Sequence, residues 1–240
     1  MLLPLNLTRQ GLRPTRWGPI IWYFLLCTSW YWECFREYRA IYTKRLQRFT
    51  KLWLILLYCV FCRTSFGAFY KEHNPTISPF ARKKHFKWLH FVHNLVNEKL
   101  SKPLFPFELL RPVFVEKYQE EEYWRKDEVS PHYYYCFWSM LYCTALNYPP
   151  QVSKTNENDL NIQKHTAQQI KQMIALLPSE TLRCHLKTTL GKGKLLFDSR
   201  TECFAFIYHW DCVSHQVSVF GKSKEVVIDY FERNFRTPKQ

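Results

Sequence analysis

Glycine is scarce in this chain, with only 6 among 240 residues. A loop that cradles a phosphate needs glycines where the backbone approaches the ligand, and a turn-rich β-barrel uses them in its hairpins. Hydrophobic residues make up 47% of the chain and aromatic residues 18%, so there is ample apolar surface to offset the entropy lost on folding. The composition therefore excludes a disordered chain, argues against a dinucleotide-binding fold, and favours a helical protein.

The chain is strongly basic, with a formal net charge of +14 that lies mostly in residues 1–130. Positive charge favours phosphate-rich or acidic partners, but it identifies neither a fold nor a reaction. Two apolar runs, residues 20–32 and 53–62, are both shorter than the about 20 residues needed to cross a bilayer. No small-residue cleavage site follows the first run. We therefore expect neither a membrane span nor a cleaved signal peptide.

Helical spacing of apolar residues predicts helices over residues 19–42, from Tyr42 onward, and over residues 81–100. A charged stretch over residues 116–130 reads as a linker. Beyond it the same order of features returns, with an aromatic segment, a proline break and further helical segments. The pattern Trp22-x-x-Leu-x-Cys-Thr28 recurs as Trp138-x-x-Leu-x-Cys-Thr144. An internal repeat is therefore expected.

Nine cysteines are present, an odd number that leaves at least one unpaired within a monomer. Two of them, Cys59 and Cys62, have the spacing that closes a small disulfide ring at a helix N-terminus. The helix dipole and the neighbouring Arg63 stabilise a thiolate at such a place. On its own, the motif fits a redox pair, half of a zinc site, or two core cysteines.

The helix predicted over residues 81–100 carries four polar residues, namely His90, His93, Asn94 and Asn97. His93, Asn97 and Leu100 share one face of it. Polar groups in an apolar stripe need partners, which are each other, the backbone or a ligand. With four such residues on one helix, a bound polar cofactor becomes competitive with a purely structural role.

Three motifs now occur in order: Trp17-Gly18-Pro19 with Trp22, then Cys59-x-x-Cys62-Arg63, then the run from Trp88 to Pro103. Within that run stands His93-Asn-x-Val-Asn-x-x-Leu-x-Lys-Pro103. In this order they resemble the Erv/ALR family of FAD-dependent sulfhydryl oxidases, over about residues 16 to 110. The resemblance implies tandem Erv-like helical bundles, each with four helices and a short extra helix.

The resemblance also implies roles for individual residues. Cys59 would exchange with incoming protein dithiols, and Cys62 would be the thiolate next to the flavin. Electrons would pass from Cys62 to FAD and on to molecular oxygen, giving hydrogen peroxide. No metal is implied. The residues expected to contact FAD are Arg16, Trp17, Gly18, Trp22, His90, His93, Asn94, Asn97, Leu100 and Lys102.

The chain departs from the family pattern in the first half. Leu25-Leu26 stands where the family has Leu-His, and Trp32-Glu33 replaces the Tyr-Pro that normally ends the first helix. A structural disulfide of the family falls on His90 and Phe107, so that cross-link is missing. Cys27 and Cys34 share a helical face and could relay electrons, although a buried structural role is favoured.

The second half resembles the family through a different subset of features. It keeps Tyr148-Pro149, but Ser179-x-x-Leu182 stands where the Cys-x-x-Cys belongs, and Arg183 follows. No His-Asn-x-Val-Asn occurs before Lys222. We therefore expect an active domain over residues 1–115, a linker over 116–130, and a degenerate domain over 131–240 that binds no FAD. Since such domains pair through their first two helices, either a homodimer or an intramolecular pseudo-dimer is expected.

Two other functions stay open. One is a catalytically inactive scaffold that keeps the fold, supported by the missing disulfide. The other is a zinc-stabilised nucleic-acid-binding module using the Cys59–Cys62 and His90–His93 pairs, whose separation fits finger spacing poorly. By analogy with oxidases of large DNA viruses, the divergence suggests a viral member, placed in host cytoplasm, nucleus or virion.

Overall fold

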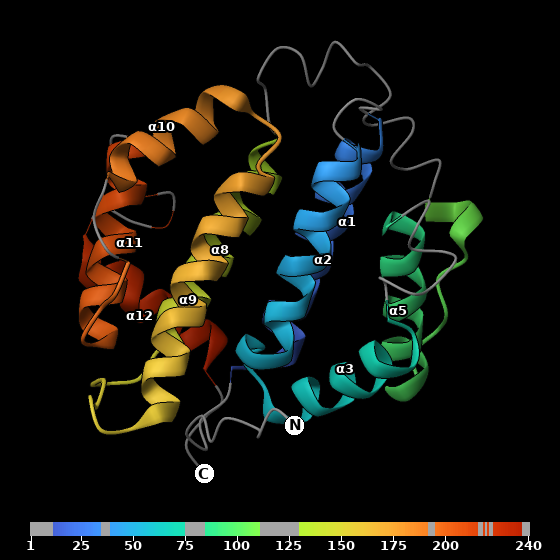
Figure 1. Ribbon diagram of the computed structural model, residues 1–240, viewed down its shortest axis with the longest axis horizontal. Helices are drawn as coiled ribbons and strands as arrows, with labels where there is room; N and C mark the ends of the chain where they lie inside the picture. The colour runs from blue at the N-terminus through green and yellow to red at the C-terminus, as the bar shows by residue number, and fades with distance from the viewer. Residues whose placement is uncertain are drawn as a thin grey trace.

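The computed structural model describes residues 12–34, 39–74, 85–110, 130–191, 195–215 and 223–236, together with Ser218 and Phe220. Among these residues β structure is confined to isolated bridges, which include Leu12 with Arg236 and Gln151 with Ser199. The all-α prediction is confirmed. The helices labelled in Figure 1 are α1 (Pro14–Cys34), α2 (Arg39–Leu56), α3 (Val60–Glu72), α5 (His85–Lys99), α8 (Pro131–Leu146), α9 (Glu157–Leu176), α10 (Glu180–Leu190), α11 (Arg200–His215) and α12 (Lys224–Phe235).

The junction between the first two helices lies earlier than predicted. α1 ends at Cys34 and α2 begins at Arg39, so the expectation of one helix over residues 19–42 was wrong. The rings of Trp32 and Tyr42 stack on each other across this junction. Because aromatic residues on both sides face the same core, the periodic pattern continues from α1 into α2 and does not mark the boundary between them. Most of the expected linker falls in residues 111–129, outside the described part of the chain.

The second half repeats the helix contacts of the first. α1 contacts α2 and α5, and α2 contacts α3; in the same way α8 contacts α9 and α11, and α9 contacts α10. A further short helical turn follows α5 over residues 107–110, and α12 follows α11. Each half is thus a bundle of four helices with one extra element, as the resemblance implied.

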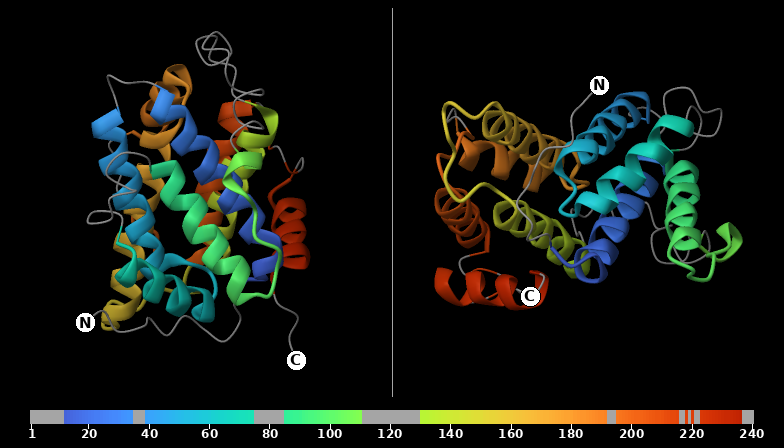
Figure 2. Two further views of the ribbon diagram at one scale, coloured as in Figure 1. Left: turned by 90° about the vertical axis from the view of Figure 1, so that its right-hand side faces the viewer. Right: turned by 90° about the horizontal axis from the view of Figure 1, so that it is seen from below.

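The two halves meet through their first two helices. α1 packs against α8 and α2 against α9, and these four helices occupy the middle of the molecule in Figure 1. Figure 2 shows α3 and α5 on one flank and α10, α11 and α12 on the other. At the contact the rings of Phe24 and Tyr133 stack at 5.1 Å, and the hydroxyls of Thr28 and Tyr133 share a hydrogen bond of 2.7 Å. Buried apolar side chains run as one cluster from Leu12 to Phe235.

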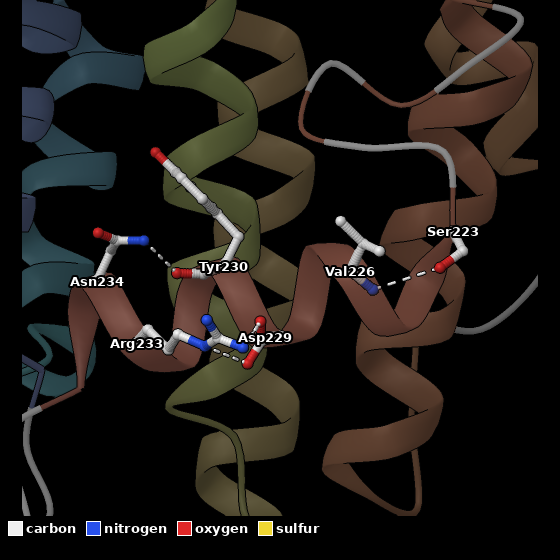
Figure 3. Close-up of polar contacts among 6 residues, drawn as sticks. All are labelled: Ser223, Val226, Asp229, Tyr230, Arg233 and Asn234. Carbon is white, nitrogen blue, oxygen red and sulfur yellow. Dashed lines mark hydrogen bonds and ion pairs between the residues drawn. The ribbon is translucent and has the colours of Figure 1, made fainter.

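The last helix, α12, shows why an amphipathic segment folds onto this core. It begins at Ser223, whose Oγ accepts a hydrogen bond from the backbone N–H of Val226 at 3.4 Å (Figure 3). On its exposed side Arg233 Nε donates to Asp229 Oδ1 at 2.6 Å, one turn away. Its opposite side packs on α8, and the buried residues there are Val227, Phe231 and Phe235. No helix among the described residues combines the length and hydropathy that a bilayer crossing requires.

Candidate active site

Cys59 and Cys62 lie at the start of α3, where the sequence predicted a helix N-terminus. Cys59 has an extended backbone (φ −129°, ψ 126°) and is the N-cap residue of α3. Its Sγ accepts a hydrogen bond from the backbone N–H of Cys62 at 3.3 Å, and its carbonyl accepts one from the N–H of Arg63 at 3.0 Å. Both thiols are partly exposed. The pair is therefore held at the positive end of a helix dipole with access to solvent.

The two sulfurs differ strongly in acidity. A hydrogen bond from the Cys62 thiol, helped by the backbone N–H groups of Cys62 and Phe61 and by the charge of Arg63, lowers the pKa of Cys59 to about 6. The same hydrogen bond, followed by burial, raises the pKa of Cys62. At neutral pH the reduced pair is thus a Cys59 thiolate that accepts a hydrogen bond from the Cys62 thiol.

Arg63 brings a buried positive charge beside this pair. Its side chain is only 6% exposed, and its Nη1 donates to the carbonyl of Ile55 at 3.2 Å, at the C-terminal end of α2. Burial lowers the pKa of Arg63, while the two cysteines raise it. Arg183 holds the equivalent place in the second half, where its Nη1 donates to the carbonyl of Pro178 at 2.8 Å. The arginine therefore ties α2 to α3 and also stabilises the thiolate.

Trp22 and His93 come together between α1 and α5. Their rings meet edge to face with centroids 4.9 Å apart. Burial, followed by the charges of His90 and Lys102, lowers the pKa of His93, so the ring is neutral at pH 7. Its nitrogens have no hydrogen-bond partner among the described residues. A half-buried imidazole of this kind leaves a polar group for a ligand to satisfy.

Aromatic rings connect this pair to the helix of the cysteines. The ring centroids of Trp22 and Trp53 of α2 lie 6.4 Å apart, and those of Trp53 and Phe66 of α3 lie 5.8 Å apart. Phe66 lies one turn beyond Cys62 on α3. Trp53 and Phe66 were not among the residues predicted for the site, although the helical spacing of Trp53 in α2 marked it as a core residue.

His90 and Asn94 hold the segment that follows α5. Asn94 Nδ2 donates to the carbonyl of Phe105 at 2.9 Å, and its Oδ1 accepts from the N–H of Phe105 at 3.0 Å. His90 Nε2 lies 2.6 Å from the same carbonyl, which requires a proton on that nitrogen. The rings of His90 and Phe107 meet edge to face at 5.2 Å. The two positions expected to carry the missing disulfide are thus in contact, joined by non-covalent interactions.

The remaining residues expected to contact FAD lie at and just after the C-terminal end of α5, and they are Asn97, Leu100 and Lys102. The carbonyl of Asn97 accepts from the N–H groups of Leu100 and Lys102 at 3.0 and 2.9 Å, and Ser101 has a positive φ of 52° that turns the chain out of the helix. Asn97 is half-buried, whereas Leu100 and Lys102 are exposed. The charge of Lys102 contributes, after burial and His90, to the lowered pKa of His93.

The Trp17 motif lies elsewhere. Trp17 is buried and meets the ring of Tyr58 edge to face at 5.5 Å, and its Nε1 donates to the carbonyl of Leu12 at 3.1 Å. Among the described residues its ring and indole N–H contact Tyr58 and Leu12, near the start of α3. Arg16 is exposed, and Gly18 has open space where a Cβ would stand. The structure therefore joins Trp22 with His93 but not Trp17.

No three or more His, Cys, Asp or Glu side chains in the described ranges are arranged to hold a metal ion. His90 Nε2 is hydrogen-bonded to the carbonyl of Phe105, and the ring of His93 lies against Trp22. Cys27, which was considered as a relay, is buried at the start of the contact with α8, and this favours its structural role.

The described residues thus form an all-α bundle that carries a Cys-x-x-Cys at the N-terminus of α3 and a half-buried histidine–tryptophan pair between α1 and α5. Residues 21–121 match the model of the Erv1/Alr family. Over these residues the chain is similar to the Erv/ALR family. The match does not extend into the second half. No characterised protein and no solved structure matched the chain in the same comparisons.

Proposed function

We propose that the chain is an FAD-linked sulfhydryl oxidase that forms disulfides in protein dithiols through Cys59 and Cys62 and passes the electrons to molecular oxygen, giving hydrogen peroxide. The observation that carries the proposal is the thiolate–thiol pair at the N-terminus of α3, within the part of the chain that matches the Erv1/Alr family. Thiol oxidation is the general activity of that family.

The chain's own sulfurs account for the exchange steps. In the oxidised pair, a substrate thiolate attacks Cys59 Sγ, the Cys59–Cys62 bond breaks, and Cys62 leaves with the electron pair. A second substrate thiolate then attacks the substrate sulfur of the mixed disulfide and releases Cys59. The lowered pKa of Cys59 makes it a good leaving group in this second step. The products are a substrate disulfide and a reduced Cys59–Cys62 pair.

The residues around Trp22 and His93 fit a flavin. The edge-to-face pair provides aromatic surface, and the neutral His93 ring, whose nitrogens have no partner among the described residues, can meet a polar ring system. Asn97 and the exposed Leu100 lie along the same helix, and Lys102 offers a cation for a pyrophosphate. When bound, FAD would supply the two-electron chemistry between thiols and oxygen. His90 and Asn94 would act on the site indirectly, by holding the segment around Phe105.

We further propose that the second half acts as an intramolecular pseudo-dimer partner. The packing of α1 on α8 and of α2 on α9 supports this, because it buries the first two helices of each half against each other. Ser179 caps α10 as Cys59 caps α3, so the helix start is kept without the sulfur. Trp138 contacts Trp210 at 5.5 Å, in the arrangement that Trp22 has with His93. A bulky indole there favours a filled core over a flavin pocket.

The proposed function is tested by thiol-dependent oxygen uptake and peroxide formation with the purified full-length chain. Wild-type protein should consume oxygen when a dithiol is added, and Cys62→Ser should abolish this. Cys184→Ser is the matched control, since Cys184 is an exposed cysteine on α10 in the second half. Absence of uptake by folded wild-type protein would favour the inactive scaffold instead.

A further inference from the structure

We infer that Tyr58 is a positioning residue through which the second half of the chain fixes the geometry of the Cys59–Cys62 pair. The inference rests on the proposed redox role of that pair and adds what holds it in place. The second half has no cysteine at residues 179 and 182, yet in this view it helps to hold the cysteine pair of the first half.

The side chain of Tyr58 reaches out of its own half. It is only 3% exposed, and its hydroxyl donates to the carbonyl of Met140 at 2.9 Å and shares a hydrogen bond with Thr144 Oγ1 at 3.0 Å. Both partners belong to α8. Burial raises the pKa of Tyr58, so the residue stays neutral and acts by position and not by charge. A buried hydroxyl with two partners is costly to displace.

The backbone of Tyr58 is also tied to the second half. Its carbonyl accepts from the N–H of Leu12 at 3.2 Å, and Leu12 pairs with Arg236 in an isolated bridge. The next residue, Arg13, donates its N–H to the carbonyl of Phe235 at 2.7 Å. Trp17 covers the Tyr58 ring edge to face. The side chain of Tyr58 is thus bonded directly to α8, and its main chain is linked to Phe235 and Arg236 through Leu12 and Arg13.

This anchoring reaches the sulfur because Cys59 follows directly. The Cys59 Sγ contact with the N–H of Cys62, at 3.3 Å, requires the extended backbone at Cys59 that starts α3. A change in the path of the chain at Tyr58 would turn Sγ away from the helix N-terminus. The other groups that act on the sulfur are Cys62, Phe61 and Arg63, and all three lie within α3 itself. Tyr58 is therefore the contact by which another part of the fold sets the position of Cys59.

The pseudo-symmetric place in the interface supplies a matched control. Pro178 stands before Ser179 as Tyr58 stands before Cys59, and the carbonyl of Pro178 accepts from the hydroxyl of Tyr31 at 3.2 Å. Tyr31 is buried like Tyr58. Tyr31→Phe thus removes a tyrosine hydroxyl from the same contact between halves, but next to the motif that has no sulfur.

The test compares Tyr58→Phe and Tyr31→Phe in the reduced full-length chain. Alkylation of Cys59 by iodoacetamide is followed against pH and read by peptide mass spectrometry. Because only the thiolate reacts, wild-type alkylation should fall as pH drops through about 6, the pKa of Cys59. We expect Tyr58→Phe to shift this midpoint upward and to lower the rate at neutral pH about three- to tenfold. Tyr31→Phe should keep the wild-type profile at a similar thermal midpoint.

Equal profiles in the two variants, or a shift in Tyr31→Phe alone, would overturn the inference. If Tyr58→Phe does not fold, Thr144→Val removes one partner of Tyr58 from α8 and should shift the midpoint in the same direction by a smaller amount, since Met140 still accepts. An unshifted Thr144→Val profile would then overturn it. Alkylation of Cys59 needs no flavin. If the wild-type protein takes up no oxygen, the proposed function fails, but the comparison of alkylation profiles still decides the role of Tyr58.

Discussion

Cysteine and serine carry out the same structural task at two corresponding helix starts. Cys59 Sγ accepts from the N–H of Cys62 at 3.3 Å, and Ser179 Oγ accepts from the N–H of Leu182 at 3.0 Å. An arginine follows Cys62 and Leu182 alike, and its N–H donates to the carbonyl of the cap residue at 3.0 Å in both halves. The cap is therefore independent of the redox chemistry, which needs the sulfur.

Because the cap and the redox chemistry are separate roles of Cys59, a substitution there can change activity without changing stability. Cys59→Ser should keep the free energy of unfolding of the reduced protein within roughly 0.5 kcal/mol of wild type, because serine is a good N-cap residue. Cys59→Ala should lower it by about 1 kcal/mol, and Ser179→Ala by a similar amount. Urea denaturation of the three variants measures this. An equal loss in Cys59→Ser and Cys59→Ala would show that the cap contributes nothing.

At this scale the sequence predicted local features and missed long-range ones. The position of Cys59 and Cys62 at a helix start follows from their spacing and is confirmed. The contact of Tyr58 with α8 could not be predicted, because it joins residues more than 80 positions apart. The placement of Trp17 under Tyr58 was missed for the same reason. Tertiary contacts of this kind leave no periodic signal.

Among the helices, α5 depends on the segment that follows it. His90 and Asn94 bind both backbone groups of Phe105, and His90 also packs on Phe107. In the family pattern a disulfide joins the positions of His90 and Phe107. Hydrogen bonds and ring contacts act only in the folded state, whereas a disulfide also restricts the unfolded chain. This element is therefore held more weakly than a disulfide would hold it.

Asn94→Ala tests this contribution. The variant loses two hydrogen bonds to Phe105, so we expect its free energy of unfolding to fall by about 1–2 kcal/mol. Protease cleavage near Phe105 should become faster. Gln168→Ala, at an exposed position of α9, is the control and should match wild type in both measurements. Unchanged stability and cleavage in Asn94→Ala would contradict the role given to this side chain.

Most helices were predictable because each buries one apolar face. The boundary between α1 and α2 was not, since Trp32 and Tyr42 continue the same aromatic pattern on either side of it. The pairing of α1 with α8 and of α2 with α9 was expected only from the resemblance. Periodicity shows that a face is buried but not which helix covers it.

In the whole molecule the two halves share one buried cluster. Phe24 and Tyr133 stack across the contact, and Trp32 Nε1 donates to the carbonyl of Leu176 at 2.9 Å. Tyr58 adds a bond next to the cysteine pair. A core that is continuous across both halves predicts cooperative unfolding.

Chemical denaturation checks this prediction. Tryptophan fluorescence and far-ultraviolet circular dichroism should report a single, coincident transition for the full-length reduced chain. Trp30, Trp32 and Trp53 lie in the first half and Trp138 and Trp210 in the second, so fluorescence samples both. Two resolved transitions would show that the halves unfold independently and would contradict a shared core.

The central claim is that the first half binds FAD and reduces it through Cys59 and Cys62. It is tested most directly by the visible absorption spectrum of the purified protein without oxygen, before and after one equivalent of a dithiol. Wild-type protein should show a flavin band that dithiol bleaches, and Cys62→Ser should show a band that dithiol leaves unchanged. A folded wild-type protein without a flavin band, or a band that dithiol leaves unchanged, would contradict it.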